Sequence, residues 1–275
     1  MLKSAIKRAL LRLWPGLYYA ITSLRFYRYC QKHFQPLQTE ICPLLYPDGE
    51  IRILSGPFAG LRYYNQIVWG PIVPKWLGCY EQELHPVIAQ ILATPYTKII
   101  DVGAAEGYYA VGLAWRSPQT PVVAYDVDPL ARIRQRQLQR LNAVENLEIR
   151  GFCNHQELAR QLSGRCLLVA DIEGFELELL NPQVCPQLHH CDILVELHHC
   201  GELGVAEVQI VLMQRFAASH QIVEMAIAAR DLSSLRHSIP QIANLDTDQL
   251  QEAVSEYRYE TQCWLWLTAK WARFN

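Results

Sequence analysis

The chain after Pro95 alternates between short apolar runs and segments with helical spacing, and this alternation constrains the fold most. Helical segments such as "PLARIRQRQLQRLNA" and "GVAEVQIVLMQRF" separate several of the runs. Apolar strands that alternate with helices are typical of a mostly parallel sheet covered on both faces. We therefore expect an α/β, doubly wound sheet of seven strands, formed by "KIIDVG", "VVAYDVD", "LEIRGF", "CLLVADIEG", "DILVELH", "HQIVEMAIAA" and "QCWLWLTA".

The N-terminus differs from the rest of the chain in charge. The first 39 residues contain seven basic residues and no acid, whereas the remainder carries 18 basic and 27 acidic residues. Residues 2–14 have apolar positions at helical spacing, with most basic residues opposite. One interpretation is a helix that binds a partner or a membrane surface, with peripheral membrane contact through residues 1–34. The alternative is a helix that packs on its own domain with solvated Lys and Arg side chains, an alternative favoured by the Pro15 break.

The segment 51–74 is rich in glycine, proline and aromatic residues, which predicts short strands and turns in a lid-like layer. "YEQELHPVIAQILA" then predicts a helix. We expect two parts: residues 1–77 as a basic helix with a cap or lid extension, and residues 78–275 as the sheet domain. No segment has the roughly 18 apolar residues that a membrane span needs. Nine scattered cysteines without C-x-x-C indicate reduced, mostly buried thiols in a cytoplasmic protein.

A glycine loop follows the first predicted strand in "KIIDVGAAEGYYAVGLA". It has the form D-x-G-x-x-x-G, without the second glycine of the dinucleotide fingerprint. Asp101 at its start suits an amino group or another cation. Asp126, at the end of the second strand, is placed to accept both hydroxyls of a ribose. The pair predicts a nucleoside with a positively charged tail, such as S-adenosyl-L-methionine; the alternative is a structural turn.

Three segments resemble the FkbM family of Rossmann-like, class I S-adenosylmethionine-dependent methyltransferases: "DVGAAEG" (101–107), "YDVDP" (125–129) and "DIEGFELELL" (171–180). The resemblance extends over about residues 78–200. It implies a Rossmann-like fold and O-methylation of a hydroxyl, often on a sugar or a glycosylated natural product. Ala105 replaces a usual Asn, so one cofactor contact is lost or comes from Glu106. Asp126 replaces a more usual Glu.

A G-x-Y-E-like segment, "LGCYEQEL", precedes the loop, and its Glu81 is a candidate to close over the methionine end of the cofactor. The bland alternative is a helix N-terminus with acids in its first turn. Together, the loop, the second strand and the resemblance give these cofactor-binding candidates: Asp101, Gly103, Ala104, Gly107, Tyr108, Asp126, Val127, Asp171 and Glu81.

Acidic residues follow the fourth predicted strand. Asp171 and Glu173 are two residues apart and share a face if the strand extends that far. Because acids just past an apolar strand are costly to bury without partners, we expect both at the site. We interpret Glu176 and Glu178 as solvated residues of a helix N-terminus, where the helix dipole favours acids.

The fifth strand places Asp192, Leu194, Glu196 and His198 on one face. His198 is a candidate general base because imidazole titrates near neutral pH, with Glu196 as its partner. The catalytic candidates are therefore His198, Glu196 and Glu173. One alternative is a core histidine that bonds to backbone. Another is a Mg²⁺ or Mn²⁺ site at Asp171, Glu196 and His198, which the sequence leaves open without favouring it.

The repeat "LHHCDILVELHHC" contains two Leu-His-His-Cys copies nine residues apart. An extended strand separates them by roughly 30 Å, so they cannot bind one ion. The first copy precedes the fifth strand and the second follows it.

The leading functional hypothesis is a methyltransferase that acts on a small-molecule or carbohydrate-like hydroxyl. The alternatives are an RNA or protein methyltransferase, which the acidic balance of the sheet domain disfavours, and a degenerate cofactor-binding scaffold. We expect no DNA partner. The acceptor pocket is expected from residues 50–80 and 230–245, where Arg230, Arg236 and His237 are interpreted chiefly as solvated loop charges.

Overall fold

The computed structural model describes residues 15–66, 69–243, 245–258 and 262–270. Its centre is a seven-stranded sheet in the order β3-β2-β1-β4-β5-β7-β6. Every predicted strand is present, within a few residues of its expected bounds. The strands are β1 (Lys98–Val102), β2 (Val122–Tyr125), β3 (Leu147–Arg150), β4 (Cys166–Ala170), β5 (Cys191–Glu196), β6 (His220–Ala226) and β7 (Cys263–Ala269).

The sheet is mostly parallel, as predicted. Strands β1 to β5 pair in parallel, and β7 runs antiparallel to both β5 and β6. All residues of β2, β4 and β5 are buried, because helices cover both faces of the sheet. The strand order and the covering helices make the fold a Rossmann-like α/β fold.

The two faces of the sheet have separate hydrophobic cores. One core joins Ile99 and Leu194 of the sheet to α4 (His85–Ala93), α5 (Tyr108–Arg116) and α6 (Pro129–Leu141). The other core joins Ile100 and Val195 to α7 (His155–Gln161), α8 (Glu176–Leu179) and α9 (Val205–Phe216). The predicted alternation along the fifth strand is therefore confirmed, since neighbouring residues enter opposite cores.

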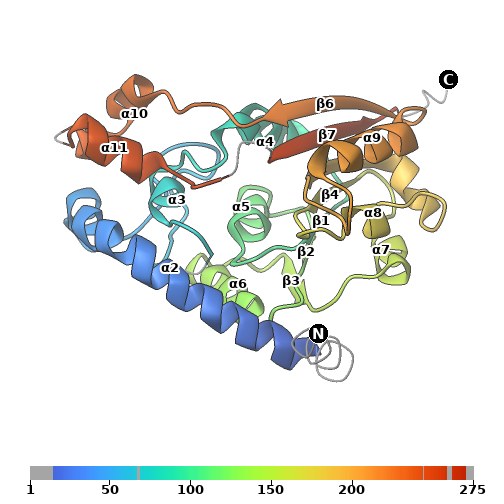
Figure 1. The fold of residues 1–275 in the computed structure, drawn as a ribbon, viewed down its shortest axis with the longest axis horizontal. Coiled ribbons are helices and arrows are strands. Elements are labelled where there is room, and N and C mark those ends of the chain that lie inside the picture. The colour runs from blue at the N-terminus through green and yellow to red at the C-terminus, as the bar shows by residue number, and fades with distance from the viewer. Residues whose placement is uncertain (1–14, 67–68, 244, 259–261, 271–275) are drawn as a thin grey trace.

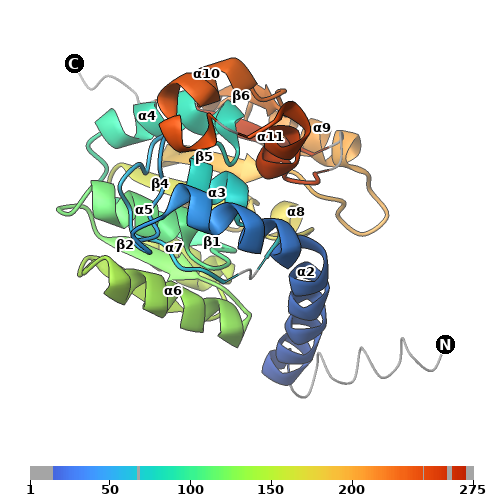
Figure 2. The same cartoon turned by 90° about the vertical axis from the view of Figure 1, so that its left-hand side faces the viewer.

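A long helix, α2 (Pro15–Leu45), was not predicted. We interpreted Pro15 and Gly16 as a break, but both lie within α2, where the first turn of a helix tolerates proline. The C-terminal part of α2 buries Ile41 and Leu45 in the first core, whereas its N-terminal part extends away from the sheet (Figure 2). The helix predicted over residues 2–14 lies outside the described residues.

The segment between α2 and the sheet is a layer over α5. Its described part contains an isolated antiparallel bridge, between Arg52 and Arg62, and the short helix α3 (Val73–Leu77). Phe58 is fully buried in the same core as Ile99. A side chain at Gly112 of α5 would meet the Phe58 ring at 2.9 Å, so glycine there permits this layer to approach the helix.

The segment 230–245, predicted as an insertion, contains α10 (Leu232–Ser238) and η3 (Pro240–Ile242), and α11 (Thr247–Val254) follows it. These helices lie at one end of the molecule, beside α3 and the C-terminal end of α2 (Figure 1). Two further short elements are η1 (Gln82–Leu84), which leads into α4, and η2 (Pro186–His190), which leads into β5. Among the described residues, no helix is long and apolar enough to cross a membrane.

Candidate active site

The loop between β1 and α5 approaches the end of β4 closely. Gly103 and Gly107 have φ values of 84° and 99°, a region that glycine reaches without strain. A side chain at Gly103 would meet the backbone oxygen of Asp171 at 1.7 Å, so this position permits glycine alone. The loop therefore lies directly between the carboxyl ends of β1 and β4, at the edge where open α/β sheets bind ligands.

Asp126 lies at the carboxyl end of β2, as predicted, and orders the loop from the other side. Its two carboxylate oxygens accept hydrogen bonds from the backbone N–H groups of Ala105, at 2.9 Å, and Asp128, at 2.8 Å. Ala105 has a φ of 43°, which this contact helps to maintain. Burial raises the pKa of Asp126 to about 7, although the two N–H groups oppose the shift. Each oxygen keeps a second lone pair for a ligand hydroxyl.

Asp101 is 2% exposed at the end of β1, and one of its carboxylate oxygens has no hydrogen-bond partner in the described structure. Burial, followed by the charge of Asp126, raises the pKa of Asp101 to about 7. A buried acceptor without a partner is costly and requires an explanation. A ligand that brings a donor or a positive charge to Asp101 supplies one.

Three other cofactor candidates have different environments. Ala104 is buried, and its N–H donates to the backbone oxygen of Tyr125 at 3.1 Å. Tyr108 is a core residue, whose ring makes edge contacts with Phe58 and Tyr80. Val127 is 37% exposed beyond the end of β2, where its side chain is open to a ligand.

The side chain of Glu106 contacts the N-terminal layer. Its carboxylate forms a buried ion pair with Lys75 and accepts a hydrogen bond from the hydroxyl of Tyr63 at 3.1 Å. Both charged side chains are about 95% buried, and the Lys75 ammonium also lies 4.6 Å from the centre of the Tyr80 ring. The suggestion that Glu106 replaces the missing Asn contact is therefore wrong, because Glu106 joins the N-terminal layer to α5.

Glu81 is 1% exposed and has a left-handed backbone conformation, with a φ of 48°. Its carboxylate accepts a hydrogen bond from the hydroxyl of Tyr109, and one of its oxygens lies 3.7 Å from Arg258. Burial raises the pKa of Glu81 to about 8, against the opposing charge of Arg258. A buried, strained acid that keeps its proton near neutrality is more typical of a functional site than of a solvated first turn.

Two arginines bridge a group of acids from separate parts of the chain. Arg258 pairs with Glu196 of β5 and with Glu83, at 3.0 Å, while Arg230 pairs with Glu83, at 2.8 Å, and with Glu256. The side chains of both arginines are about 90% buried. Arg230 was predicted to be a solvated loop charge, and this is wrong because the α10–α11 segment folds over the acids at the sheet edge.

The chain turns immediately after β4. The strand ends at Ala170, and Glu173 has a φ of 50°, so Asp171 and Glu173 do not share a strand face. The turn instead leaves the Asp171 side chain 33% exposed and the Glu173 side chain 83% exposed, with both carboxylates near His198. The Oδ1 atom of Asp171 is nevertheless buried, and this burial raises the pKa of Asp171 above its ordinary value, with the charges of Glu196, Glu173 and Glu81 adding to the effect.

His198 follows β5 and has a different partner from the one predicted. Its Nδ1 lies 2.8 Å from the carboxylate of Glu176, which is fully buried at the start of α8. The interpretation of Glu176 as a solvated helix residue is therefore wrong, whereas Glu178 is exposed, as predicted. Glu196 lies on the other side of the ring, with an oxygen 3.7 Å from Nε2.

The charges around His198 determine its protonation. Burial by itself lowers the pKa of His198, but the hydrogen bond to Glu176 and the charges of Glu196 and Glu173 outweigh it and raise the pKa. The neighbouring carboxylates thus favour positive charge at Nε2, which in the ligand-free protein is the protonated form of the ring. Three predicted residues, Asp171, Glu196 and His198, converge there, and their ligand-type atoms all lie within 4.8 Å of one another.

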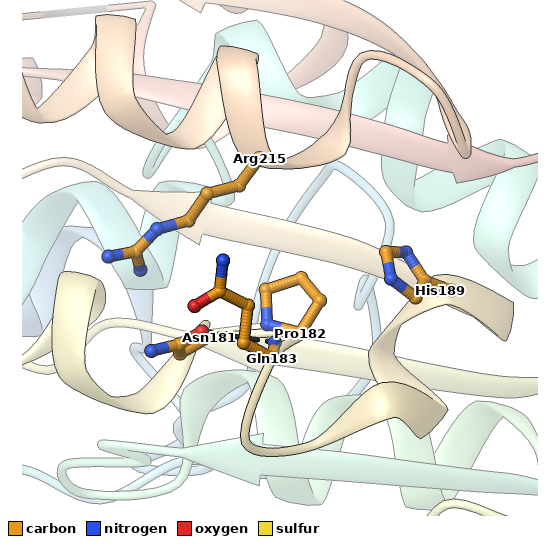
Figure 3. Close-up of a pocket in the computed structure, with 5 residues that line it drawn as sticks. All are labelled: Asn181, Pro182, Gln183, His189 and Arg215. Carbon is orange, nitrogen blue, oxygen red and sulfur yellow. Dashed lines mark hydrogen bonds between the residues drawn. The ribbon is translucent and has the colours of Figure 1, made fainter.

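The other Leu-His-His-Cys copy lies at the opposite edge of the sheet, before β5. His189 lines a surface cavity with Asn181, Pro182, Gln183 and Arg215 (Figure 3). Its Nδ1 lies 3.0 Å from the hydroxyl of Ser219, and Arg215 donates to the backbone oxygens of Leu177 and Leu180. These contacts connect α8, α9 and η2, so His189 and Arg215 both have structural partners.

Two residues that sequence reasoning missed complete the site. Glu176 was visible as an acid in "DIEGFELELL", but its burial depends on the turn after β4, which no local pattern indicates. Arg258 carried no motif, and only the fold brings it to Glu196 over 62 residues of chain. The sequence indicated Arg258 only as an isolated basic residue before the last apolar strand, which is weak evidence for a site residue.

No protein-family model matches the chain, and no curated protein matches its sequence. Similar solved structures include a putative O-methyltransferase from Klebsiella pneumoniae, with 11% identity, a TM-score of 0.44, and coverage of 90% of this chain and 100% of that one. An rRNA methylase from Streptococcus thermophilus has 11% identity, a TM-score of 0.44, and coverage of 68% and 96%. A coclaurine N-methyltransferase bound to N-methylheliamine and SAH has 11% identity, a TM-score of 0.40, and coverage of 97% and 94%. These likenesses are distant.

Proposed function

We propose that this chain is an S-adenosylmethionine-dependent methyltransferase that methylates a hydroxyl on a small-molecule or carbohydrate-like acceptor. One observation carries the proposal. A glycine loop at the carboxyl edge of the sheet lies between Asp101 and Asp126, and it abuts the His198 cluster through Gly103. One buried oxygen of Asp101 has no hydrogen-bond partner among the described residues. A nucleoside site and a polar, acid-rich site are therefore adjacent.

The residues at the loop fit this cofactor. Asp126 offers a lone pair on each oxygen for the two ribose hydroxyls, and its position at the end of β2 is the usual one for this contact. Asp101 and Glu81 offer carboxylates, both held at raised pKa values by burial, to the amino group or the sulfonium. A cationic ligand offsets the cost of ionising these acids in a buried site.

S-adenosylmethionine supplies a methyl group bound to a positively charged sulfur, which needs no help as a leaving group. The chain's own task is to orient the acceptor hydroxyl and remove its proton. His198 Nε2 faces this position while Glu176 holds Nδ1, so the ring orientation is set before the acceptor binds. Glu196 and Glu173, both within 3.7 Å of Nε2, favour the imidazolium that forms when the ring accepts the proton.

The choice of an oxygen acceptor rests on the resemblance to the FkbM family. The matching segments, 101–107, 125–129 and 171–180, include the loop, Asp126 and the turn with Asp171 and Glu176. In this chain the resemblance supports O-methylation of a sugar-like hydroxyl. A broad nucleic-acid substrate is disfavoured because four carboxylates, those of Asp171, Glu173, Glu176 and Glu196, surround His198.

Binding of S-adenosylhomocysteine, measured by isothermal titration calorimetry on the full chain, tests the proposal. We expect one site with an affinity in the micromolar range or tighter. The absence of binding to protein that shows a cooperative thermal transition would refute the proposal. Labelled cofactor incubated with metabolite extracts and followed by mass spectrometry then identifies the acceptor.

We propose further that α2 contacts an anionic membrane surface. Its N-terminal half exposes Leu24, Phe26 and Tyr29 beside Arg25 and Arg28, in a segment without acids before residue 40. Exposed apolar side chains among basic ones are the composition of helices that lie in a lipid interface. The enzyme would then meet its acceptor near the membrane.

A further inference from the structure

The cluster at the ends of β4 and β5 contains three potential metal ligands from two neighbouring strands. His198 Nε2 lies 3.7 Å from Asp171 Oδ1 and 3.7 Å from Glu196 Oε2. One such atom from each of the three residues lies within 4.8 Å of the other two. A fourth group, the exposed carboxylate of Glu173, lies 3.6 Å from Nε2 at the rim.

These separations suit a bound cation. Ligands at about 2.1 Å from an octahedral ion lie roughly 3.0 Å apart when adjacent and roughly 4.2 Å apart when opposite. The observed distances of 3.7 Å fall between these two values. The separations from Nε2 to the two carboxylates are therefore compatible with one octahedral ion after small movements of the side chains.

The orientation of His198 is that of a metal ligand. Its Nδ1 bonds to the fully buried carboxylate of Glu176, which assigns the proton to Nδ1 when the ring is neutral and leaves the Nε2 lone pair facing the two acids. Metal-ligating histidines regularly have such a carboxylate behind the ring. This contact is independent of the distances among the three ligand atoms.

The charges of the cluster also favour a cation. Arg258 contacts Glu196 through Oε1, so Oε2 remains directed toward His198. Asp171 Oδ1 is buried and has no hydrogen-bond partner in the described part of the chain. Acids this close together repel each other unless positive charge lies between them. The partly exposed Asp171 side chain gives a path from solvent.

We propose that Asp171, Glu196 and His198 bind one divalent cation of the Mg²⁺ or Mn²⁺ class. Two carboxylates and one imidazole form a mostly oxygen donor set, which these ions prefer over soft metals. The use of the ion rests on the proposed function: three protein ligands leave positions open, and the acceptor hydroxyl occupies one. His198 is then a ligand and no longer the base: coordination lowers the pKa of the hydroxyl, and the exposed carboxylate of Glu173 at the rim accepts the released proton.

Titration of the metal-free full chain with Mn²⁺, followed by electron paramagnetic resonance, tests the site. We expect about one tight site, at least tenfold weaker binding in Asp171→Asn and His198→Gln, and unchanged binding in His199→Gln. His199 is a matched control because it is the exposed neighbour in the same repeat. Equal Mn²⁺ binding by wild type, Asp171→Asn and His198→Gln, or no tight site in folded wild type, overturns the proposal.

A parallel titration with S-adenosylhomocysteine separates this proposal from the proposed function. Nucleoside binding without tight Mn²⁺ binding overturns the metal site and leaves the methyltransferase intact. Mn²⁺ binding that Asp171→Asn abolishes, without nucleoside binding, supports the metal site and overturns the methyltransferase. Thermal melting of each variant checks its fold, and in wild type Mn²⁺ should raise the melting temperature, an effect that His198→Gln removes.

Discussion

The buried carboxylate of Glu176 lies 2.8 Å from Nδ1 of His198 and sets the direction in which the other ring nitrogen points. Glu176 begins α8, and His198 follows β5, so the contact joins two turns at the same edge of the sheet. The sulfhydryl of Cys200 also donates to Glu176, at 3.1 Å. Glu176 is fully buried, so we interpret it as a residue that positions the His198 ring.

Replacement of Glu176 should affect turnover more than cofactor binding. In Glu176→Ala the ring loses its orientation, and we expect kcat to fall about 10- to 100-fold, as for other residues behind a functional histidine. Glu176→Gln should recover part of the loss, because its amide oxygen still accepts from Nδ1–H. Steady-state kinetics measure kcat, and calorimetry measures S-adenosylhomocysteine affinity, which should stay within about threefold. A parallel loss in both would indicate a structural role alone.

Asp126→Ala should weaken S-adenosylhomocysteine binding by about 10- to 100-fold, since hydrogen bonds to charged groups contribute about 1.5–3 kcal/mol. The loss also releases the N–H of Ala105 and loosens the loop. Calorimetric titration measures the affinity. Asp248→Asn, an exposed acid in the first turn of α11, is the control and should bind like wild type. Unchanged affinity in Asp126→Ala would place the ribose elsewhere.

Asp101 gives a pH dependence of stability. Its pKa in the folded state, about 7, lies above its ordinary value of 3.8, so ionisation costs more in the folded than in the unfolded protein. The stability that Asp101 contributes is complete below about pH 4 and is lost as pH rises toward 7. Asp101→Asn should therefore gain melting temperature relative to wild type between pH 5 and 8, by the equivalent of a few kcal/mol.

The same substitution should weaken S-adenosylhomocysteine binding, because the amide cannot offer a negative charge to the ligand's amino group. A variant that is more stable at pH 8 but binds less tightly is the expected signature of a functional acid. A difference in melting temperature between variant and wild type that stays constant from pH 5 to pH 8 would contradict the assignment.

The Lys75–Glu106 pair should be important for stability. Both side chains are about 95% buried, so Lys75→Met leaves an unpaired buried carboxylate and should lower the free energy of unfolding by about 3–5 kcal/mol. Adding Glu106→Gln should restore part of this loss, because the amide removes the uncompensated charge. Urea unfolding of both single variants and the double variant measures the coupling. Additive losses would show that the two groups do not interact.

The part of α2 that exposes Leu24, Phe26 and Tyr29 should bind acidic vesicles. We expect full-length protein to float with liposomes that contain phosphatidylserine and to remain behind with neutral ones. Leu24→Ser combined with Phe26→Ser should reduce the floating fraction several-fold. Ile210→Ser, on the 55% exposed apolar position of α9, is the control for loss of any exposed apolar side chain. Equal flotation of all three proteins would exclude α2 as the lipid contact.

The sheet was predictable because strands that are buried on both faces are nearly continuous apolar runs, and such runs can be recognised in the sequence. All seven strands matched, and so did the positions of Asp101, Asp126, Glu196 and His198 at or beyond the carboxyl ends of their strands. The α2 helix was not predictable in the same way. Its prolines argue against a helix locally, and burial of Ile41 and Leu45 in the core outweighs that local preference.

Local periodicity predicted the seven strands and the edge of the sheet at which the polar residues gather. The partners of the buried charges depend on the tertiary structure: Glu176 rather than Glu196 for His198 Nδ1, Arg258 for Glu196, and Lys75 for Glu106. The partner of each buried charge depends on which turns, distant in the sequence, meet at the edge of the sheet. Because an unpaired buried charge is costly, each buried charged side chain needs a partner, and local sequence patterns do not predict which residue that partner is.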